Sequence, residues 1–387
     1  MDIANAINID DLARLARRRL PGVVFDYLDG GAEDEVTLRA NREAFEGYRF
    51  RPRVLTGNAE RDLSITLFGE RLALPFMVGP TGLNGIHWVD ADLALARAAA
   101  EAGTVFTLST PANNSIEQIA KATRGPKWFQ LYPWGDRNLS ARLIARAREA
   151  GYKVLVVTVD SLVAGKRERD ARNKFSHELR FTPAVMLDGL THPRWLAGVW
   201  LRRGMPRFEN IAEFAAPGAN ASALAQFTRS QRNAGLAWSD IAWIKQQWGG
   251  PMLVKGVLSI GDLQRAAGAG ADGIVISNHG GRQLDGAVAT IDVLPEIVAA
   301  AGKDMAVLID GGFRRGSDVV KAFALGASGV LLGRATLYGV AAGGQPGAAK
   351  AIAILRDEVD RVLALLGCRS MKEVSMKHLS SQVINRN

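Results

Sequence analysis

The stretch GIVISNHGGRQLDG, residues 273–286, joins a short apolar run to a histidine, two glycines, an arginine and an aspartate. The run GIVI has the length and the β-branched content of a buried strand. If the strand ends at Ser277, His279 and Arg282 lie at its carboxyl end, and the two glycines between them let the backbone approach a ligand closely. This arrangement is typical of an α/β enzyme site, although a glycine turn with a surface histidine would contain the same residues.

Seven similar apolar runs bounded by turn residues occur along the chain, and most are separated by segments with helical spacing. They are LPFMVGP (74–80), VFTLST (105–110), WFQLYP (128–133), VLVVTVD (154–160), MLVKGV (252–257), AVLIDGG (306–312) and GVLLGR (329–334). Together with GIVISNHG they give eight strands alternating with helices, which predicts an α/β fold, the (β/α)8 TIM barrel. A doubly wound sheet needs a G-x-G-x-x-G turn after its first strand, and none follows the first run.

Polar residues gather where these runs end, and in such a barrel the carboxyl ends of all strands meet at one mouth. The sequence therefore predicts an active site at that mouth. The residues concerned are Thr81, Ser109, Gln130, Tyr132, Thr158, Asp160, Lys255, His279, Arg282, Asp310, Arg314 and Arg334. We expect residues 1–387 to form a single domain, with an N-terminal helical extension and a long insertion, 161–236, after the fourth strand.

Composition limits the classes of protein that fit. With 387 residues and 48% hydrophobic content, the chain can bury one large core. Its single cysteine, Cys368, excludes an internal disulfide framework and a multi-cysteine metal site, and we predict no bound metal. The charged N-terminus lacks the apolar core of a secretory signal, and no run of about 18 apolar residues predicts a membrane span.

Two glycine-rich strand ends, DGGFRRG and LGR, follow the seventh and eighth runs, where barrels of this type commonly bind phosphate. The backbone N–H groups of Gly311, Gly312 and Gly333 could bind phosphate oxygens, while Arg314 and Arg334 neutralise the charge. Two ordinary turns with surface arginines are the alternative interpretation.

Six motifs, in their order along the chain, resemble those of the FMN-dependent 2-hydroxy-acid dehydrogenase and oxidase family. They are FDYLDGGAEDE, TVDSLVAGKRERD, VKGV, SNHGGRQLDG, DGGFRRG and LGRATLYG, and the resemblance runs from about residue 8 to about residue 378. It implies bound FMN and the oxidation of a 2-hydroxy acid.

The resemblance also implies which residues hold FMN. The phosphate would lie on Arg314, Arg334 and the nearby glycines, and the ribityl chain near Asp310 and Lys255. The flavin ring would lie against Pro80, Thr81 and Gly82, with its polar edge hydrogen-bonded by Ser109, Gln130, Thr158 and Ser277. Lys255 has a physical role as well, because a cation near the flavin N1–C2=O region stabilises the negative charge of the reduced ring.

A 2-hydroxy acid presents a carboxylate, which needs a bidentate cation, and a hydroxyl beside a C–H bond, which needs a base next to an electron acceptor. Arg282 and Arg167 resemble the family's carboxylate-binding arginines, and His279 resembles its catalytic base. Asp160 would hydrogen-bond His279 and stabilise the imidazolium. The family's substrate-contacting tyrosines correspond to Tyr27 and Tyr132. Hydride transfer and a carbanion route both remain open.

Two residues predict a large substrate side chain. Most family members with small substrates have alanine at the position of Gly82, and some have a bulky tryptophan at the position of Pro111. The sequence most resembles members that oxidise (S)-mandelate to benzoylformate. Oxidation of L-lactate, or a family member that passes electrons to oxygen, is the alternative within the family. A basic barrel without catalytic activity is the remote alternative for a net charge of +9, but no nucleic-acid-binding module is present and we predict no such partner.

The middle of the insertion, 183–208, combines tryptophans and other apolar residues with flanking arginines, and it is too short to span a bilayer. Its tryptophans, Trp195 and Trp200, would suit the interfacial layer of a membrane. We predict a peripheral contact with the cytoplasmic side of the inner membrane, with a membrane quinone as electron acceptor. A lid over the site or a subunit contact is the alternative. The resemblance also implies a homo-oligomer, a tetramer.

Overall fold

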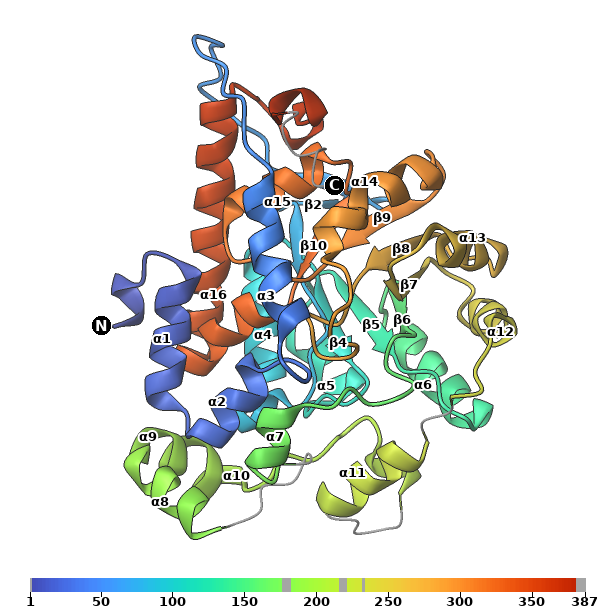
Figure 1. The fold of residues 1–387 in the computed structure, drawn as a ribbon. Coiled ribbons are helices and arrows are strands. Elements are labelled where there is room, and N and C mark those ends of the chain that lie inside the picture. The colour runs from blue at the N-terminus through green and yellow to red at the C-terminus, as the bar shows by residue number, and fades with distance from the viewer. Residues whose placement is uncertain (1, 176–181, 216–220, 232–233, 381–387) are drawn as a thin grey trace.

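The computed structural model describes residues 2–175, 182–215, 221–231 and 234–380. Eight parallel strands in these ranges form a closed barrel in the order β10-β3-β4-β5-β6-β7-β8-β9 (Figure 1). The strands are β3 (Phe76–Val78), β4 (Phe106–Ser109), β5 (Lys127–Leu131), β6 (Val154–Thr158), β7 (Met252–Val257), β8 (Gly273–Ile276), β9 (Ala306–Ile309) and β10 (Gly329–Leu332). Each coincides with one of the eight apolar runs, so the predicted (β/α)8 barrel is confirmed.

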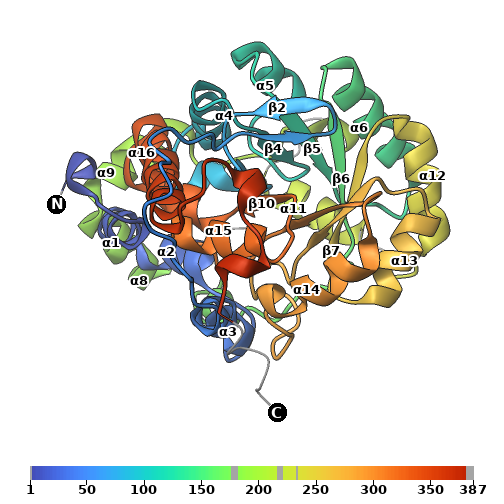
Figure 2. The ribbon, with the colours of Figure 1, turned by 90° about the horizontal axis from the view of Figure 1, so that it is seen from above.

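A ring of helices surrounds the barrel when it is seen from above (Figure 2). Side-chain caps define several of their starts: Ser115 and Ser259 each accept a hydrogen bond from a backbone N–H group that the first helical turn leaves free. The helices are α4 (Ala91–Glu101), α5 (Ile116–Ala122), α6 (Arg137–Glu149), α12 (Trp238–Trp248), α13 (Ile260–Gly268), α14 (Thr290–Ala301), α15 (Gly316–Ala324) and α16 (Arg334–Leu366).

The predicted N-terminal helical extension is also confirmed. It consists of α1 (Ile9–Arg19), α2 (Gly22–Asp29) and α3 (Val36–Glu43), and α1 packs against α16 (Figure 1). After α2, the Ala32 N–H donates to the Gly281 carbonyl at 2.8 Å and the Glu33 N–H donates to the Lys166 carbonyl at 2.8 Å. These bonds hold the extension against the loops at the carboxyl ends of β6 and β8.

A short antiparallel hairpin, β1 (Ile65–Leu67) and β2 (Glu70–Leu72), covers the opposite end of the barrel. The Phe68 ring in its turn packs edge-on against Trp128 at the start of β5, with 6.0 Å between ring centroids. The amino ends of the strands are therefore closed, and the mouth is open only at the carboxyl ends. The remaining short helices outside the insertion are η1 (Ile3–Asn5), η2 (Ala44–Gly47), η3 (Asn84–Ile86), η6 (Met371–Glu373) and η7 (Met376–His378).

The predicted insertion follows β6, the fourth strand of the barrel, and is largely helical. Its helices are α7 (Glu168–Arg172), α8 (Pro183–Thr191), α9 (Pro193–Trp195), η4 (Leu196–Trp200), α10 (Leu201–Arg203), η5 (Ala212–Phe214) and α11 (Ala221–Ser230). The expectation that its tryptophans form an outward apolar patch is wrong for Trp195, which is 3% exposed and donates its indole N–H to the Ile86 carbonyl at 2.7 Å. The segment packs on the loop after β3 because that loop offers both an apolar surface and a free carbonyl.

Other apolar side chains of the insertion do face outward. Met186, Leu187, Leu190 and Leu201 are each more than half exposed. No helix in the described part of the chain is both long enough and apolar enough to cross a bilayer. These four exposed residues lie in the short helices α8 and α10.

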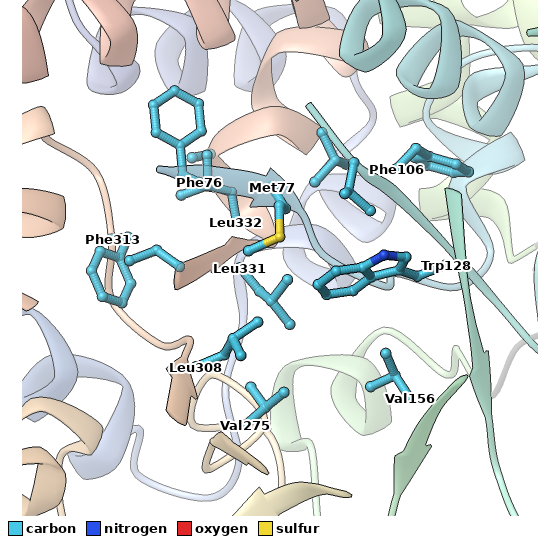
Figure 3. Packing of buried hydrophobic residues seen from close by; sticks show 14 of the residues in the cluster. Phe76, Met77, Phe106, Trp128, Val156, Val275, Leu308, Phe313, Leu331 and Leu332 are labelled. Carbon is cyan, nitrogen blue, oxygen red and sulfur yellow. The ribbon is translucent and has the colours of Figure 1, made fainter. Parts of the chain in front are cut away.

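Apolar side chains fill the barrel interior below its mouth. Met77, Trp128, Val275 and Leu308 converge there and are at most 1% exposed (Figure 3). Because side chains alternate along a strand, the residue two positions beyond Leu308 also faces inward, but at the mouth. That residue is Asp310, so one strand supplies both core packing and a polar group at the site.

Leu308→Ala should lower the free energy of unfolding by about 2–5 kcal/mol, since it leaves a cavity where the interior strands meet. Leu365→Ala on the outer surface of α16, where the leucine is 64% exposed, should change stability by less than about 0.5 kcal/mol. Urea unfolding followed by tryptophan fluorescence measures both. Equal midpoints for the two variants would contradict the assignment of Leu308 to the core.

Candidate active site

The barrel mouth holds a cavity of about 230 Å³. Strand ends, the N-terminal extension and the insertion all contribute to its lining. Among the residues predicted from the sequence, the lining includes Tyr27, Pro80, Thr81, Gly82, Ser109, Tyr132, Arg167, Lys255, His279, Arg282, Asp310, Gly311, Gly312, Arg314, Gly333 and Arg334. Of the other predicted residues, Gln130, Asp160 and Ser277 hydrogen-bond to side chains of this lining, and Thr158 hydrogen-bonds to Gln130.

His279 lies at the centre of a hydrogen-bonded group. Its Nδ1 is 2.8 Å from Asp160 Oδ1, and its Nε2 is 3.4 Å from the Tyr132 hydroxyl. The backbone at His279 has a φ of 57°, in the left-handed region, and its N–H donates to Ser277 Oγ at 3.1 Å. The turn after β8 therefore presents Nε2 to the cavity while Nδ1 remains on the aspartate.

Burial and neighbouring charges keep His279 neutral and Asp160 ionised. Burial lowers the pKa of His279, and Asp160 offsets part of that effect. Burial also acts to raise the pKa of Asp160, but the neighbouring His279 and Lys255 hold it below its ordinary value. A neutral imidazole beside an ionised carboxylate is the arrangement that a general base requires.

Lys255 forms the polar floor of the cavity. It is 5% exposed, its Nζ lies 2.9 Å from Asp310 Oδ2, and it donates to Ser277 Oγ at 2.8 Å. Burial opposes its charge, but Asp310 and Asp160 together raise the pKa of Lys255 above the ordinary value. A fixed positive charge therefore faces the cavity from below.

A chain of polar side chains runs across the neighbouring strand ends. Ser109 donates to Gln130 Oε1 at 2.7 Å, and Gln130 Nε2 donates to Thr158 Oγ1 at 3.0 Å. These bonds fix the orientation of the Gln130 amide, which is 1% exposed. The chain offers hydrogen-bonding groups to the edge of a planar heterocycle.

Several arginines create an excess of positive charge above the floor. Arg282 donates to the Gly30 carbonyl at 2.7 Å and lies 5.1 Å from the centroid of the Tyr27 ring. Burial and the nearby Arg167 and Arg334 lower the pKa of Arg282 to about 9. An anion in the cavity would relieve this repulsion.

The two remaining arginines of this group differ in their partners. Arg167 Nε is buried and has no hydrogen-bond partner in the described ranges. Arg334, in contrast, donates to three backbone carbonyls, those of Leu28, Gly280 and Gly30, at 2.8–3.1 Å. Arg334 therefore also holds the N-terminal extension at the mouth of the barrel. The LGR motif alone did not predict this second role.

The glycines after β9 and β10 line the cavity, and Gly312 also lets the backbone of α3 at Asn41 come close. Gly311 and Gly312 have φ values of 95° and 83°, and a Cβ atom at Gly312 would fall 2.0 Å from the Asn41 carbonyl oxygen. A Cβ atom at Gly333 would meet nothing closer than 4.0 Å. With Arg314 and an Asp310 Oδ1 that lacks a partner in the part of the chain described, these residues fit the phosphate and ribityl chain of FMN. The polar floor fits its ring.

The cavity also contains residues that the sequence reasoning missed. They include His87, Trp134, Ser161, Leu162 and Phe208. Trp134 directly follows the third apolar run, 128–133, and could have been found by extending that motif by one residue. Phe208 and His87 lie in connecting segments with no motif of their own, so only their packing reveals them.

Gly82 occupies a tighter position than the sequence indicated. A Cβ atom there would lie 2.9 Å from Pro111 Cγ and 3.3 Å from the Pro111 carbonyl oxygen. Both residues line the cavity. A side chain at position 82 would therefore displace Pro111 rather than simply fill open space.

Comparison with known proteins shows the family to which this chain belongs. A family model for FMN-dependent dehydrogenases matches residues 16–381. (S)-Mandelate dehydrogenase from Pseudomonas putida is 44% identical over 378 residues, which cover 98% of this chain and 95% of that protein. Glycolate oxidase from Spinacia oleracea is 40% identical over 374 residues, which cover 97% of this chain and 95% of that protein.

The fold is similar over the same length. A crystal structure of the monotopic membrane protein (S)-mandelate dehydrogenase superimposes with a TM-score of 0.94 at 44% identity, covering 97% of this chain and 99% of that one. The chain therefore belongs to the FMN-dependent dehydrogenase family, and it is an FMN enzyme that oxidises 2-hydroxy acids.

Proposed function

We propose that the protein oxidises (S)-mandelate to benzoylformate and passes the electrons from FMN to a membrane quinone. The observation that carries the choice of substrate is the apolar part of the cavity lining. It includes Gly82, Pro111 and the aromatic Trp134 and Phe208, a set that suits a phenyl group better than the hydrogen of glycolate or the methyl of lactate. The 44% identity to (S)-mandelate dehydrogenase supports the same choice.

The carboxylate of the substrate would be bound by the arginines. Arg282 and Arg167 bring two positive charges to one side of the cavity, and a carboxylate there forms charge-assisted hydrogen bonds with both. Tyr27 stacks beside Arg282 at 5.1 Å and so helps to orient it. The substrate hydroxyl would then lie between the Tyr132 hydroxyl and His279 Nε2.

His279 would accept the proton that the substrate loses, at Nε2. Asp160 would hold Nδ1–H at 2.8 Å and stabilise the imidazolium once it forms. FMN supplies the two-electron acceptor when it is bound. Lys255 would keep a positive charge at the floor throughout, which favours electron transfer towards that side of the cavity.

The groups proposed to hold FMN lie around the rest of the cavity. Arg314, Arg334 and the glycines 311, 312 and 333 would bind the phosphate, and Asp310 with Lys255 the ribityl chain. The ring would lie on Pro80, Thr81 and Gly82. Its polar edge would meet Ser109, Gln130, Thr158 and Ser277.

We also propose that the insertion contacts the cytoplasmic side of the inner membrane. Its exposed Met186, Leu187, Leu190 and Leu201 lie in a segment that also carries exposed arginines at 194, 202, 203 and 207. Apolar side chains with basic neighbours suit an interface with anionic lipid, where each cation contributes about 1 kcal/mol. The similar crystal structure is described as that of a monotopic membrane protein. A homo-oligomer, a tetramer, is part of the same proposal.

His279→Gln should leave the protein yellow with bound FMN, yet slow flavin reduction by substrate about 10²–10⁴-fold, because the base is lost. Stopped-flow bleaching of the flavin measures this rate. His192→Gln is the matched control, since His192 also lies beside an aspartate, with Nδ1 3.3 Å from Asp188 Oδ1, but outside the cavity. A rate within tenfold of wild type for His279→Gln would remove His279 from the role of base.

The wild-type enzyme should have a higher kcat/KM for (S)-mandelate than for L-lactate or glycolate in a dye-reduction assay. Gly82→Ala should reduce that preference by roughly 1–3 kcal/mol, since its methyl group pushes Pro111 towards the substrate side chain. Steady-state kinetics with and without the dye test both points and detect direct use of oxygen. A preference for lactate or glycolate in wild type would overturn the proposed substrate.

Replacing Met186, Leu187, Leu190 and Leu201 with serine should weaken sedimentation with vesicles that contain anionic lipid, while flavin reduction by mandelate stays unchanged. Serine at Val54 and Leu55, which are 81% and 102% exposed far from the insertion in sequence, is the matched control. Added salt should weaken the binding of the wild type. Equal sedimentation of both variants would reject the membrane contact.

A further inference from the structure

His87 is a buried histidine in the cavity wall that the chemistry described above does not use. It follows η3 in the loop after β3 and is 1% exposed. It lines the cavity, where its ring stacks on the Tyr27 ring with centroids 6.2 Å apart. Neither ring nitrogen meets the geometry of a hydrogen bond among the described residues, although the Asn84 backbone carbonyl lies near enough to act on the ring as an acceptor. An unpartnered polar side chain at this depth calls for a partner from a ligand.

The surrounding contacts hold the His87 loop in place without binding the ring itself. Asn84 Nδ2 donates to the buried Asp92 Oδ1 at 2.7 Å, and the Ile86 carbonyl accepts the Trp195 indole N–H at 2.7 Å. The imidazole is thus positioned by its backbone and by Tyr27. A preorganised group of this kind binds a ligand at little conformational cost.

The imidazole of His87 is uncharged. Burial, aided by the positive charge of Arg282, lowers its pKa to about 3, and the nearby Asn84 carbonyl offsets this only slightly. A neutral imidazole has one N–H donor and one nitrogen acceptor. Its best partner is an uncharged group that can both donate and accept, and a hydroxyl group is the simplest of these.

The reacting groups of the substrate do not need His87. In the proposed function the carboxylate lies on Arg282 and Arg167, and the hydroxyl on Tyr132 and His279. With the carboxylate and the hydroxyl assigned to other residues, a polar group on the substrate side chain is the remaining part of the substrate that could pair with His87. The apolar part of the lining, which includes Trp134, suits an aromatic ring in that side chain.

We propose that His87 is a specificity-determining residue that hydrogen-bonds a hydroxyl substituent on the aromatic ring of the substrate. The preferred substrate class is then that of ring-hydroxylated mandelates. This inference rests on the proposed oxidation of mandelate-type acids and narrows it.

The test compares kcat/KM for (S)-mandelate with kcat/KM for its 3-hydroxy and 4-hydroxy derivatives. In wild type, at least one hydroxylated acid should exceed mandelate by roughly 10- to 100-fold, the usual effect of pairing a buried polar group. His87→Leu should abolish that preference, so that the ratio of kcat/KM for the hydroxylated acid to kcat/KM for mandelate falls to about one. His87→Asn, which keeps a donor and an acceptor, should retain part of the preference.

If His87 had only a structural role, His87→Leu would lower kcat/KM for all three acids by the same factor. Thr107→Val is the matched control, since Thr107 Oγ1 is also buried without a partner in the described ranges but does not line the cavity. This variant should keep the wild-type preference. The same ratio of hydroxylated to plain mandelate in wild type and His87→Leu would overturn the proposal while the proposed function stands. Oxidation of lactate or glycolate with none of any mandelate would overturn both.

Discussion

The pairing of β10 with β3 closes the barrel, and the geometry of the active site depends on that closure. The pairs Val330 with Phe76, Leu331 with Met77 and Leu332 with Val78 join the last strand to the first. In an open sheet, the carboxyl ends of the outer strands would lie several strand widths apart. Closure brings the ends of all eight strands around one axis, so that residues far apart in the sequence face a common cavity.

Because side chains alternate along each strand, one inward residue packs the core and the inward residue two positions later lies at the mouth. Val275 and Leu308 are paired in the interior, and the inward residues two positions later, Ser277 and Asp310, lie at the mouth. The apolar layer excludes water from beneath Lys255 and so strengthens its interactions with the carboxylates around it. The core is therefore a condition for the electrostatics of the site as well as for folding.

The charges at the mouth do not balance within the protein. Lys255 forms an ion pair with Asp310, whereas Arg282 and Arg167 have no carboxylate in ion-pair contact in the described part of the chain, and Asp170 acts on both only from a greater distance. This excess favours anions, and an FMN phosphate and a substrate carboxylate are both anions. A bound anion relieves the repulsion between the arginines, and this relief favours anion binding.

Segments outside the barrel complete the site through backbone hydrogen bonds. The Gly30 carbonyl accepts hydrogen bonds from Arg282 and Arg334, both at or below 2.8 Å, and this contact brings Tyr27 to the mouth. On another side, Trp195 anchors the insertion to the loop after β3. These contacts join elements separated by more than 100 residues.

The sequence by itself determined the barrel, because eight apolar runs of strand length alternate with helical segments. It also determined which polar residues lie at the strand ends around the cavity, because a polar residue there breaks the apolar pattern. It could not determine the partners of Arg334, the burial of Trp195 or the presence of His87 in the cavity. Those depend on contacts between loops that have no periodicity of their own. Only the tertiary structure decides which of their side chains face the cavity, since a loop's orientation is set by packing and backbone hydrogen bonds to distant segments.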